Sequence, residues 1–268
     1  MPSETLLVLQ DWPTWLIVVV ILGLMTAANE AGFRFGRRHH RDESESSRSV
    51  SNTFKGSVFT LIALVLGFSF SATTNRHEIR QRVVLDQANA VGTCYQRAGL
   101  LDDDSRDRIR GVLRRYLSVR IDYGRMDAND TNSARRREEI DRTLDDLWAA
   151  VEDATRRQPE KVRVSQIVPA ANEVCDMSST RAWAGHNHLP APVLVLLITA
   201  VIMGCAMLGH SSGQVGVRHL GLWLASNTLF GLVLFVVLDF DRPRRGLIRI
   251  DQTPLVELHA ALGAAPVP

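Results

Sequence analysis

Lysine and cysteine are scarce in this sequence. Lys55 and Lys161 are the only lysines among its 31 basic residues, and its 268 residues include three cysteines. The basic residues are balanced by 29 acidic ones to a net charge of +2, and the two kinds interleave along the chain. This pattern is typical of solvated helices and argues against a nucleic-acid-binding protein.

Motifs of enzymes and of metal proteins are missing as well. The chain has no glycine-rich phosphate loop and no nucleophile elbow. His186 and His188 lie close together, but no cysteine or acidic residue accompanies them at the spacing of a metal site. We therefore expect no enzymatic activity, no cofactor and no bound metal.

Long apolar runs are what the sequence does have, although its mean hydropathy is only −0.01. The last two runs contain no charged residue and approach the ~20 residues that cross a bilayer. Residues 1–13 contain Glu4 and Asp11 but no Lys or Arg, so we expect the first run to remain a membrane helix rather than to act as a secretory signal. The four expected spans are residues 12–28, 58–72, 189–208 and 220–238.

A strongly charged block separates the second expected span from the third. Apolar residues recur there at spacings of three and four, which predicts amphipathic helices around residues 109–117 and 140–154. A third stripe, over residues 84–98, predicts that the second span continues out of the membrane as one helix.

Together these patterns predict an all-α integral membrane protein with four transmembrane helices and a helical bundle inserted between spans two and three. Residues 1–74 would hold spans one and two, 75–187 the water-facing insert continuous with span two, 188–240 spans three and four, and 241–268 a C-terminal latch with a short helix.

Three blocks of the sequence resemble the bestrophin-like family of four-span membrane proteins from bacteria and plastids. They are ALVLGFSFSATTNRHEIRQRVVLDQANAVGTCYQRAGLL (63–101), VLRRYLSVR (112–120) and DFDRPRRGLIRIDQTPLVEL (239–258), in order over nearly the whole chain. The family is distantly similar to bestrophins, which are pentameric anion channels with pore-lining second spans. The resemblance therefore implies a homo-oligomeric membrane protein that conducts a small anion.

One face of the second span is small or polar. It consists of Ser57, Thr60, Leu64, Gly67, Ser71, Thr74 and Glu78, which follow one another at spacings of three and four. One interpretation is close packing between membrane helices, which associate through small residues and hydroxyls. The other is that several copies of this helix line a pore, with Leu64 and Phe68 as its constriction. Both interpretations require protein to cover this face.

Few polar residues lie elsewhere in the spans. Asn227 is near the middle of the fourth, where an unpaired amide is costly, so we expect it to bond to another helix. Glu30, at the end of the first span, has Arg34 four residues later, which predicts a local ion pair.

The segment after the fourth span is dense in charge. Its candidate functional residues are Asp239, Asp241, Arg242, Arg244 and Arg245. The acids end a helix, where the helix dipole disfavours negative charge, so they require cationic partners. One interpretation is a structural latch that folds back on the insert, and the other is a vestibule that attracts anions.

The side of the membrane on which the insert lies is predicted by charge near the first span. The connection after that span carries six Lys or Arg between Arg34 and Lys55, whereas residues 1–13 carry none. The positive-inside rule then places the insert outside the cytoplasm. Charges near the other spans oppose this placement: Arg218 brings the connection side to seven in total, whereas the insert side carries eight, so the overall count is a tie. The resemblance to bestrophins, whose large helical part is cytoplasmic, favours the reverse orientation.

Two cysteines of the insert offer a further hypothesis. Cys94 follows the second span and Cys175 precedes the third at comparable distances, so an antiparallel bundle can bring them to similar heights. A disulfide between them is then feasible if the insert is extracytoplasmic.

The main functional prediction is a homo-oligomeric, anion-selective ion channel in the cell membrane, with span two lining the pore. Its expected partners are the lipid bilayer, further copies of the chain and a small anion, but no nucleic acid. The alternative is a non-conducting scaffold or sensor whose helical insert binds a protein or ligand.

Overall fold

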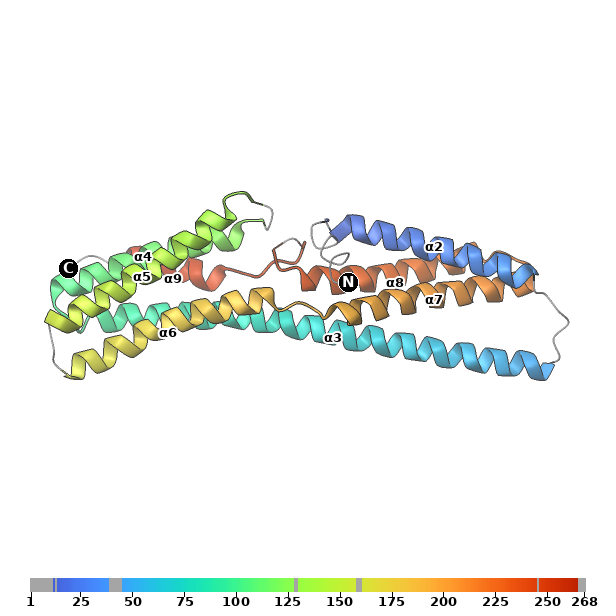
Figure 1. Cartoon of the computed structure of the whole chain (residues 1–268), viewed down its shortest axis with the longest axis horizontal. Helices are drawn as coiled ribbons and strands as arrows, with labels where there is room; N and C mark the ends of the chain where they lie inside the picture. Colours follow the sequence, from blue (N-terminus) through green and yellow to red (C-terminus); the bar gives the residue numbers. More distant parts are fainter. Residues whose placement is uncertain are drawn as a thin grey trace. The chain divides into compact units, whose positions relative to one another are not determined.

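The computed structural model describes residues 12, 14–38, 45–127, 130–157, 161–244 and 246–264. Regular structure among these residues is entirely helical, which confirms the predicted all-α class (Figure 1). The helices are α2 (Thr14–Arg38), α3 (Glu45–Ala98), α4 (Asp103–Arg125), α5 (Ser133–Arg157), α6 (Lys161–His186), α7 (Ala191–Val215), α8 (Leu220–Asp241) and α9 (Thr253–Ala264).

Within the described residues, four helical stretches are long and apolar enough to cross a bilayer, as the sequence predicts. They lie within Trp15–Arg38, Ser51–Ala98, Ser165–Val215 and Leu220–Asp241, and the third of these ranges includes the connection between α6 and α7. Figure 1 shows α3 as one unbroken helix, and its 54 residues far exceed the ~20 that a bilayer requires. The part of α3 beyond the apolar stretch is therefore available to pack with other helices outside the bilayer.

The chain divides into two compact units. The span unit comprises Met1–Asn75 and His188–Arg242, and the insert unit comprises Arg76–Asn187 and Pro243–Pro268. Helix α3 contributes its first part to the span unit and its second part to the insert unit.

Close backbone contact between α2 and α7 organises the span unit. A Cβ built on Gly209 of α7 would lie 1.9 Å from the carbonyl oxygen of Asn29, and one on Gly32 of α2 would lie 2.0 Å from that of Ala206. Only glycine permits such an approach, and small residues are typical of membrane helix interfaces. The glycines therefore set the distance between these two helices.

Buried amides connect α2 to α8. Asn29 donates its Nδ2 hydrogen to Asn227 Oδ1 at 2.9 Å, and Asn227 Nδ2 donates to Thr26 Oγ1 at 3.2 Å. The predicted inter-helical bond of Asn227 is therefore confirmed. The expected ion pair of Glu30 with Arg34 also forms, at 2.8 Å, and Arg218 joins it at 2.9 Å.

The insert unit has an apolar core of its own. The second part of α3 meets α4, α5 and α6 in this core, and α9 packs against α4 with Leu255 fully buried. Buried side chains of α4 include Ile109, Leu113, Tyr116 and Leu117, at the spacing expected from the sequence. The final helix is thus a structural part of the insert unit.

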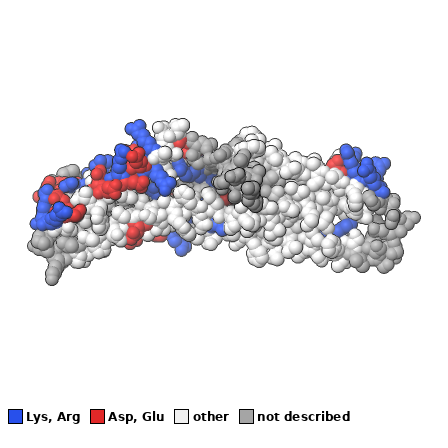
Figure 2. Space-filling model, viewed as in Figure 1, with Lys and Arg blue, Asp and Glu red and all other residues white. Residues whose placement is uncertain are grey.

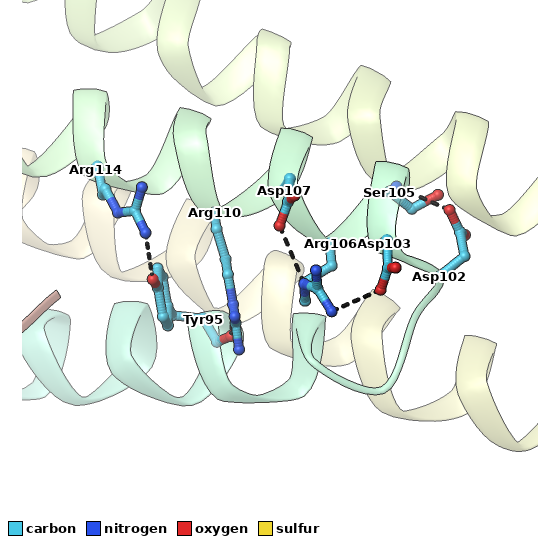
Figure 3. A network of polar contacts seen from close by, with 8 residues as sticks. All are labelled: Tyr95, Asp102, Asp103, Ser105, Arg106, Asp107, Arg110 and Arg114. Carbon is cyan, nitrogen blue, oxygen red and sulfur yellow. Dashed lines mark hydrogen bonds and ion pairs between the residues drawn. The ribbon is translucent and has the colours of Figure 1, made fainter. Parts of the chain in front are cut away.

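Polar contacts fix the connection between α3 and α4 (Figure 3). The Arg110 guanidinium lies 4.5 Å from the centroid of the Tyr95 ring, and Arg114 Nη2 donates to the Tyr95 hydroxyl at 2.7 Å. Asp102 caps α4 by accepting a hydrogen bond from the Ser105 N–H at 3.0 Å, which holds the pKa of the Asp102 carboxyl below its usual range.

The three cysteines are free thiols. Cys94 and Cys205 are buried and Cys175 is partly buried. The disulfide considered for Cys94 and Cys175 is therefore not formed in this structure.

Candidate functional site

The first part of α3 presents two different sides. Ile62, Leu66, Ser69 and Thr73 are buried within the span unit. Ile62 reaches over Gly204 of α7, where its Cδ1 lies 3.0 Å from the position of an added Cβ. This side of α3 is the one that the span unit covers.

The predicted pore-lining residues lie on the other side. Leu64 is 52% exposed and Phe68 is 67% exposed, and a Cβ added to Gly67 would meet no atom within 4 Å. Thr74 is partly buried, and the remaining members of the set are exposed: Ser57, Thr60, Ser71 and Glu78. The described part of a single chain therefore leaves this face largely uncovered.

Hydroxyls on this face bond to the backbone of their own helix. Ser57 donates to the Thr53 carbonyl at 3.1 Å, Thr60 to the Gly56 carbonyl at 3.0 Å, and Thr74 to the Phe70 carbonyl at 2.9 Å. Their hydroxyl oxygens remain available as acceptors for water. To donate to an anion, a hydroxyl would have to rotate away from its carbonyl partner.

Charged residues are unevenly distributed over the molecule. On the face drawn in Figure 2, they gather over α4 and α5 of the insert unit, whereas the span-unit surface is uncharged over most of its length. A surface without charge is what lipid tails require. The distribution is consistent with a multi-pass membrane protein.

The two acids at the end of α8 are built into the span unit. Asp239 is fully buried, and Asp241 Oδ1 accepts a hydrogen bond of 2.7 Å from the backbone N–H of Leu189. His188 Nδ1 lies 2.8 Å from the Asp241 carbonyl oxygen. These contacts join the end of α8 to the start of α7, and both carboxylates are buried.

The arginines that follow these two acids belong to different units. Arg242 donates to the Trp12 carbonyl at 2.7 Å within the span unit. Arg244 belongs to the insert unit, where it lies 4.3 Å from the centroid of the Tyr123 ring and donates to its hydroxyl at 2.9 Å. Arg245 lies outside the described residues. The described members of the charged segment are therefore divided between the two units.

A buried polar cluster in the insert unit was not predicted from the sequence. Its members are Gln87 of α3, Arg120 of α4, Arg181 of α6, and Gln252 just before α9. One signal for it was present: Arg120 follows Tyr116 by four residues and so continues the buried stripe of α4. A charged residue in such a stripe indicates a polar partner inside the bundle.

Comparison with known proteins identifies the fold. A family model described as "Bestrophin-like domain" matches residues 18–255. The crystal structure of a bacterial bestrophin homologue from Klebsiella pneumoniae matches with a TM-score of 0.66 and 14% identity, over 93% of this chain and 98% of that one.

Two further solved structures agree with that match. A bestrophin homologue from the same organism with one substituted residue gives a TM-score of 0.66 at 14% identity, over 91% of this chain and 97% of that one. A protein described as a membrane protein gives 0.65 at 14% identity, over 92% and 97%. No curated protein matches the sequence significantly.

Proposed function

The chain belongs to the Bestrophin-like family, whose domain it matches over residues 18–255, and from this membership we propose that several copies assemble in the cell membrane into an anion-selective ion channel. In this proposal the exposed face of α3 lines the pore, with Leu64 and Phe68 as its constriction. One chain cannot enclose a pore with a single face, so the channel requires a symmetric homo-oligomer.

The exposed face of α3 is the observation that carries the proposal. The span unit buries Ile62 and Leu66 but leaves Leu64, Gly67 and Phe68 uncovered. A row of small and hydroxylated residues beside two bulky apolar ones suits a water-filled path with a hydrophobic constriction, which controls ion passage by dewetting. It is less suited to lipid than the exposed surface of α8, which carries the large apolar side chains of Leu224, Leu229 and Leu232.

Selectivity for anions is proposed from the resemblance of the family to bestrophins rather than from charges on α3. Glu78 and Arg82 are both exposed and lie one helical turn apart, so their charges offset each other at that end of the face. The chloride-to-cation permeability ratio is the measurement that tests this part.

Chloride flux from liposomes that contain the purified protein tests conduction. We expect flux from the wild type and a higher flux from Leu64→Ala and Phe68→Ala, because trimming either side chain widens the constriction. Leu224→Ala is the matched control, since Leu224 is 70% exposed on α8 and outside the proposed pore. Absence of flux from all variants with the oligomer intact, or a monomeric protein in mild detergent, would refute the channel.

The insert is proposed to lie outside the cytoplasm, on the charge distribution around the first span. Labelling of Thr131→Cys and Val217→Cys with an impermeant thiol reagent tests this, because Thr131 lies in the exposed α4–α5 connection and Val217 in the exposed α7–α8 connection. We expect Thr131→Cys to react in intact cells and Val217→Cys only in broken ones. The opposite pattern places the insert in the cytoplasm.

A cleft in the insert unit favours a second candidate function, that of a non-conducting scaffold or sensor. The cleft lies between α3 and α6, has a volume of roughly 500 Å³ and is lined by Asp86, Asn89, Arg97 and Glu173 among others. Charges of both signs suit a polar ligand or a peptide. An intact oligomer without flux, combined with a ligand whose binding is lost in Glu173→Ala, would favour this function over conduction.

A further inference from the structure

The polar cluster in the insert unit brings two arginines together away from bulk solvent. Arg120 of α4 is 5% exposed, and Arg181 of α6 is partly buried. Gln87 lies between them: its Oε1 accepts a hydrogen bond of 2.6 Å from Arg181 Nη1 and one of 3.4 Å from Arg120 Nε. Gln252 Oε1 accepts from Arg181 Nη2 at 2.5 Å. Four separate segments of the chain thus meet in this cluster, and two of them each contribute a positive charge.

The partners of these arginines are neutral. Gln87 and Gln252 present amide oxygens, and Gln87 in turn donates to the Tyr116 hydroxyl at 2.6 Å. Among the described residues, neither guanidinium forms an ion pair with a carboxylate. Asp141 favours the charge of Arg120 from beyond ion-pair distance, and Arg137 opposes that effect.

A third cation lies beside the pair. The guanidiniums of Arg244 and Arg120 lie 4.3 Å and 5.8 Å from the centroid of the Tyr123 ring. Arg244 donates to the Tyr123 hydroxyl at 2.9 Å and, more weakly, to the Asp127 carbonyl at 3.5 Å. Within the described part of the chain, Arg244 forms no ion pair with a carboxylate, so it adds positive charge to the cluster.

The charges of this cluster cannot be removed by loss of a proton. Burial lowers the pKa of the Arg120 guanidinium, yet an arginine side chain stays protonated in proteins. Burying a charge without a counter-charge costs several kcal/mol in order of magnitude, and neutral amides offset only part of that cost. The described side chains of the cluster therefore leave an excess of positive charge, which a bound anion would neutralise.

Hydrogen-bond donors for such an anion are present. A guanidinium has five N–H groups, of which Arg120 uses one and Arg181 two among the described residues. Space is limited, because a Cβ on Gly124 would lie 2.5 Å from Gln252 Oε1 and 3.3 Å from Arg181 Nη2. Such close packing suits a monatomic ion better than a bulky oxyanion or an organic acid.

We propose that the insert unit contains a structural binding site for a small inorganic anion, with chloride as the natural candidate, held by Arg120 and Arg181 and shaped by Gln87 and Gln252. The bound anion neutralises the arginine pair and so stabilises the junction of α3, α4 and α6 with the segment before α9. This site lies in the insert unit rather than in the span unit, and it does not depend on conduction through α3.

Thermal unfolding of the full-length protein in mild detergent tests the site. Sodium chloride is compared with sodium gluconate at the same ionic strength, so that general screening is constant. We expect chloride to raise the unfolding temperature of the wild type by at least about 2 °C and to have no such effect on Arg181→Gln. Arg115→Gln is the matched control: Arg115 is an exposed residue of α4 paired with Asp146, and this variant keeps the chloride effect.

A second variant tests the charge argument directly. Gln87→Glu places a carboxylate of the same shape between the two guanidiniums. We expect it to unfold at a higher temperature than the wild type in gluconate and to lose its response to chloride. Equal unfolding temperatures of the wild type in the two salts, or an unchanged chloride effect in Arg181→Gln, would overturn the proposal.

Two further measurements separate this site from the proposed pore and from folding defects. Leu64→Ala changes the exposed face of α3, and we expect it to keep the chloride effect if the ion binds in the insert unit. Loss of the chloride effect in Leu64→Ala would assign the ion to the pore and overturn the proposal. If Arg181→Gln does not fold, a crystal of the wild type grown in bromide decides: an anomalous peak at the arginine pair supports the site, and its absence refutes it.

Discussion

Replacement of Gly209 by alanine tests whether backbone contact between α2 and α7 holds the span unit together. The added Cβ would lie 1.9 Å from the Asn29 carbonyl oxygen and 2.7 Å from its carbon. These are backbone atoms, so no side chain can rotate to relieve the clash. Because ordinary contact begins near 3.4 Å, α2 and α7 must separate by roughly 1.5 Å at this point.

The expected cost follows from two opposing effects. Overpacking of this kind costs ~1–3 kcal/mol, and separation also strains the Asn29–Asn227 hydrogen bond in the same region. The change from glycine to alanine inside a helix by itself stabilises the folded state by ~0.5–1 kcal/mol. We therefore expect Gly209→Ala to lower the free energy of unfolding by about 1–2 kcal/mol.

Gly23→Ala is the matched control, because Gly23 lies in α2 and a Cβ there would meet no atom within 4 Å. This variant gains the helix propensity without the clash and is expected to be as stable as the wild type or more so. Unfolding of the detergent-solubilised protein, followed by tryptophan fluorescence during titration with a denaturing detergent, measures both. Equal stability of Gly209→Ala and Gly23→Ala would refute close backbone packing as the organising contact.

Three further predictions concern single polar residues. Asp102→Ala removes the cap of α4 and is expected to destabilise the protein by about 1 kcal/mol in thermal unfolding followed by circular dichroism. Asn227→Leu leaves its buried amide partner without a bond and is expected to cost roughly 1–2 kcal/mol in the same detergent titration. Hydrogen bonds from Thr253 hold the pKa of the Asp251 carboxyl below its usual range. A depressed pKa stabilises the fold at neutral pH, and that contribution is lost as pH falls below about 4, so Asp251→Asn should show a weaker acid destabilisation in thermal unfolding.

Each of these has a result that contradicts it. An Asp102→Ala variant with unchanged unfolding would show that the α4 terminus is solvated as favourably as it is capped. Leu224→Ala changes an exposed site on the same helix. If Asn227→Leu is as stable as this variant, the amide hydrogen bond does not contribute to packing of the spans. An identical pH profile for Asp251→Asn would show that its hydrogen bonds form equally in the unfolded chain.

The architecture was predictable because its signals are local. Hydropathy over some twenty residues identifies the spans, and spacings of three and four identify the buried stripes of α4 and α5, whatever the rest of the chain does. The need of Asn227 for a hydrogen-bond partner was equally predictable, since an amide in a membrane helix needs one. The identity of that partner was not predictable, because Asn29 is 198 residues away in the sequence.

The candidate site was predictable only in part. A helical face can be read from spacing, and Ser57 through Glu78 indeed share one, but their proposed role in a pore stays a prediction. The sequence determined the composition of each face of α3. Only the tertiary structure decided which face the other spans cover, because packing of Ile62 against Gly204 depends on where α7 lies.

The sequence by itself thus determined an all-helical chain with four membrane spans, a long second-span helix and a charged insert, since hydropathy and helical periodicity act over neighbouring residues. The tertiary structure alone brought Arg120 of α4 to Arg181 of α6. Two distant arginines become neighbours only when separate helices pack, and the electrostatic cost of that meeting is what points to a bound anion.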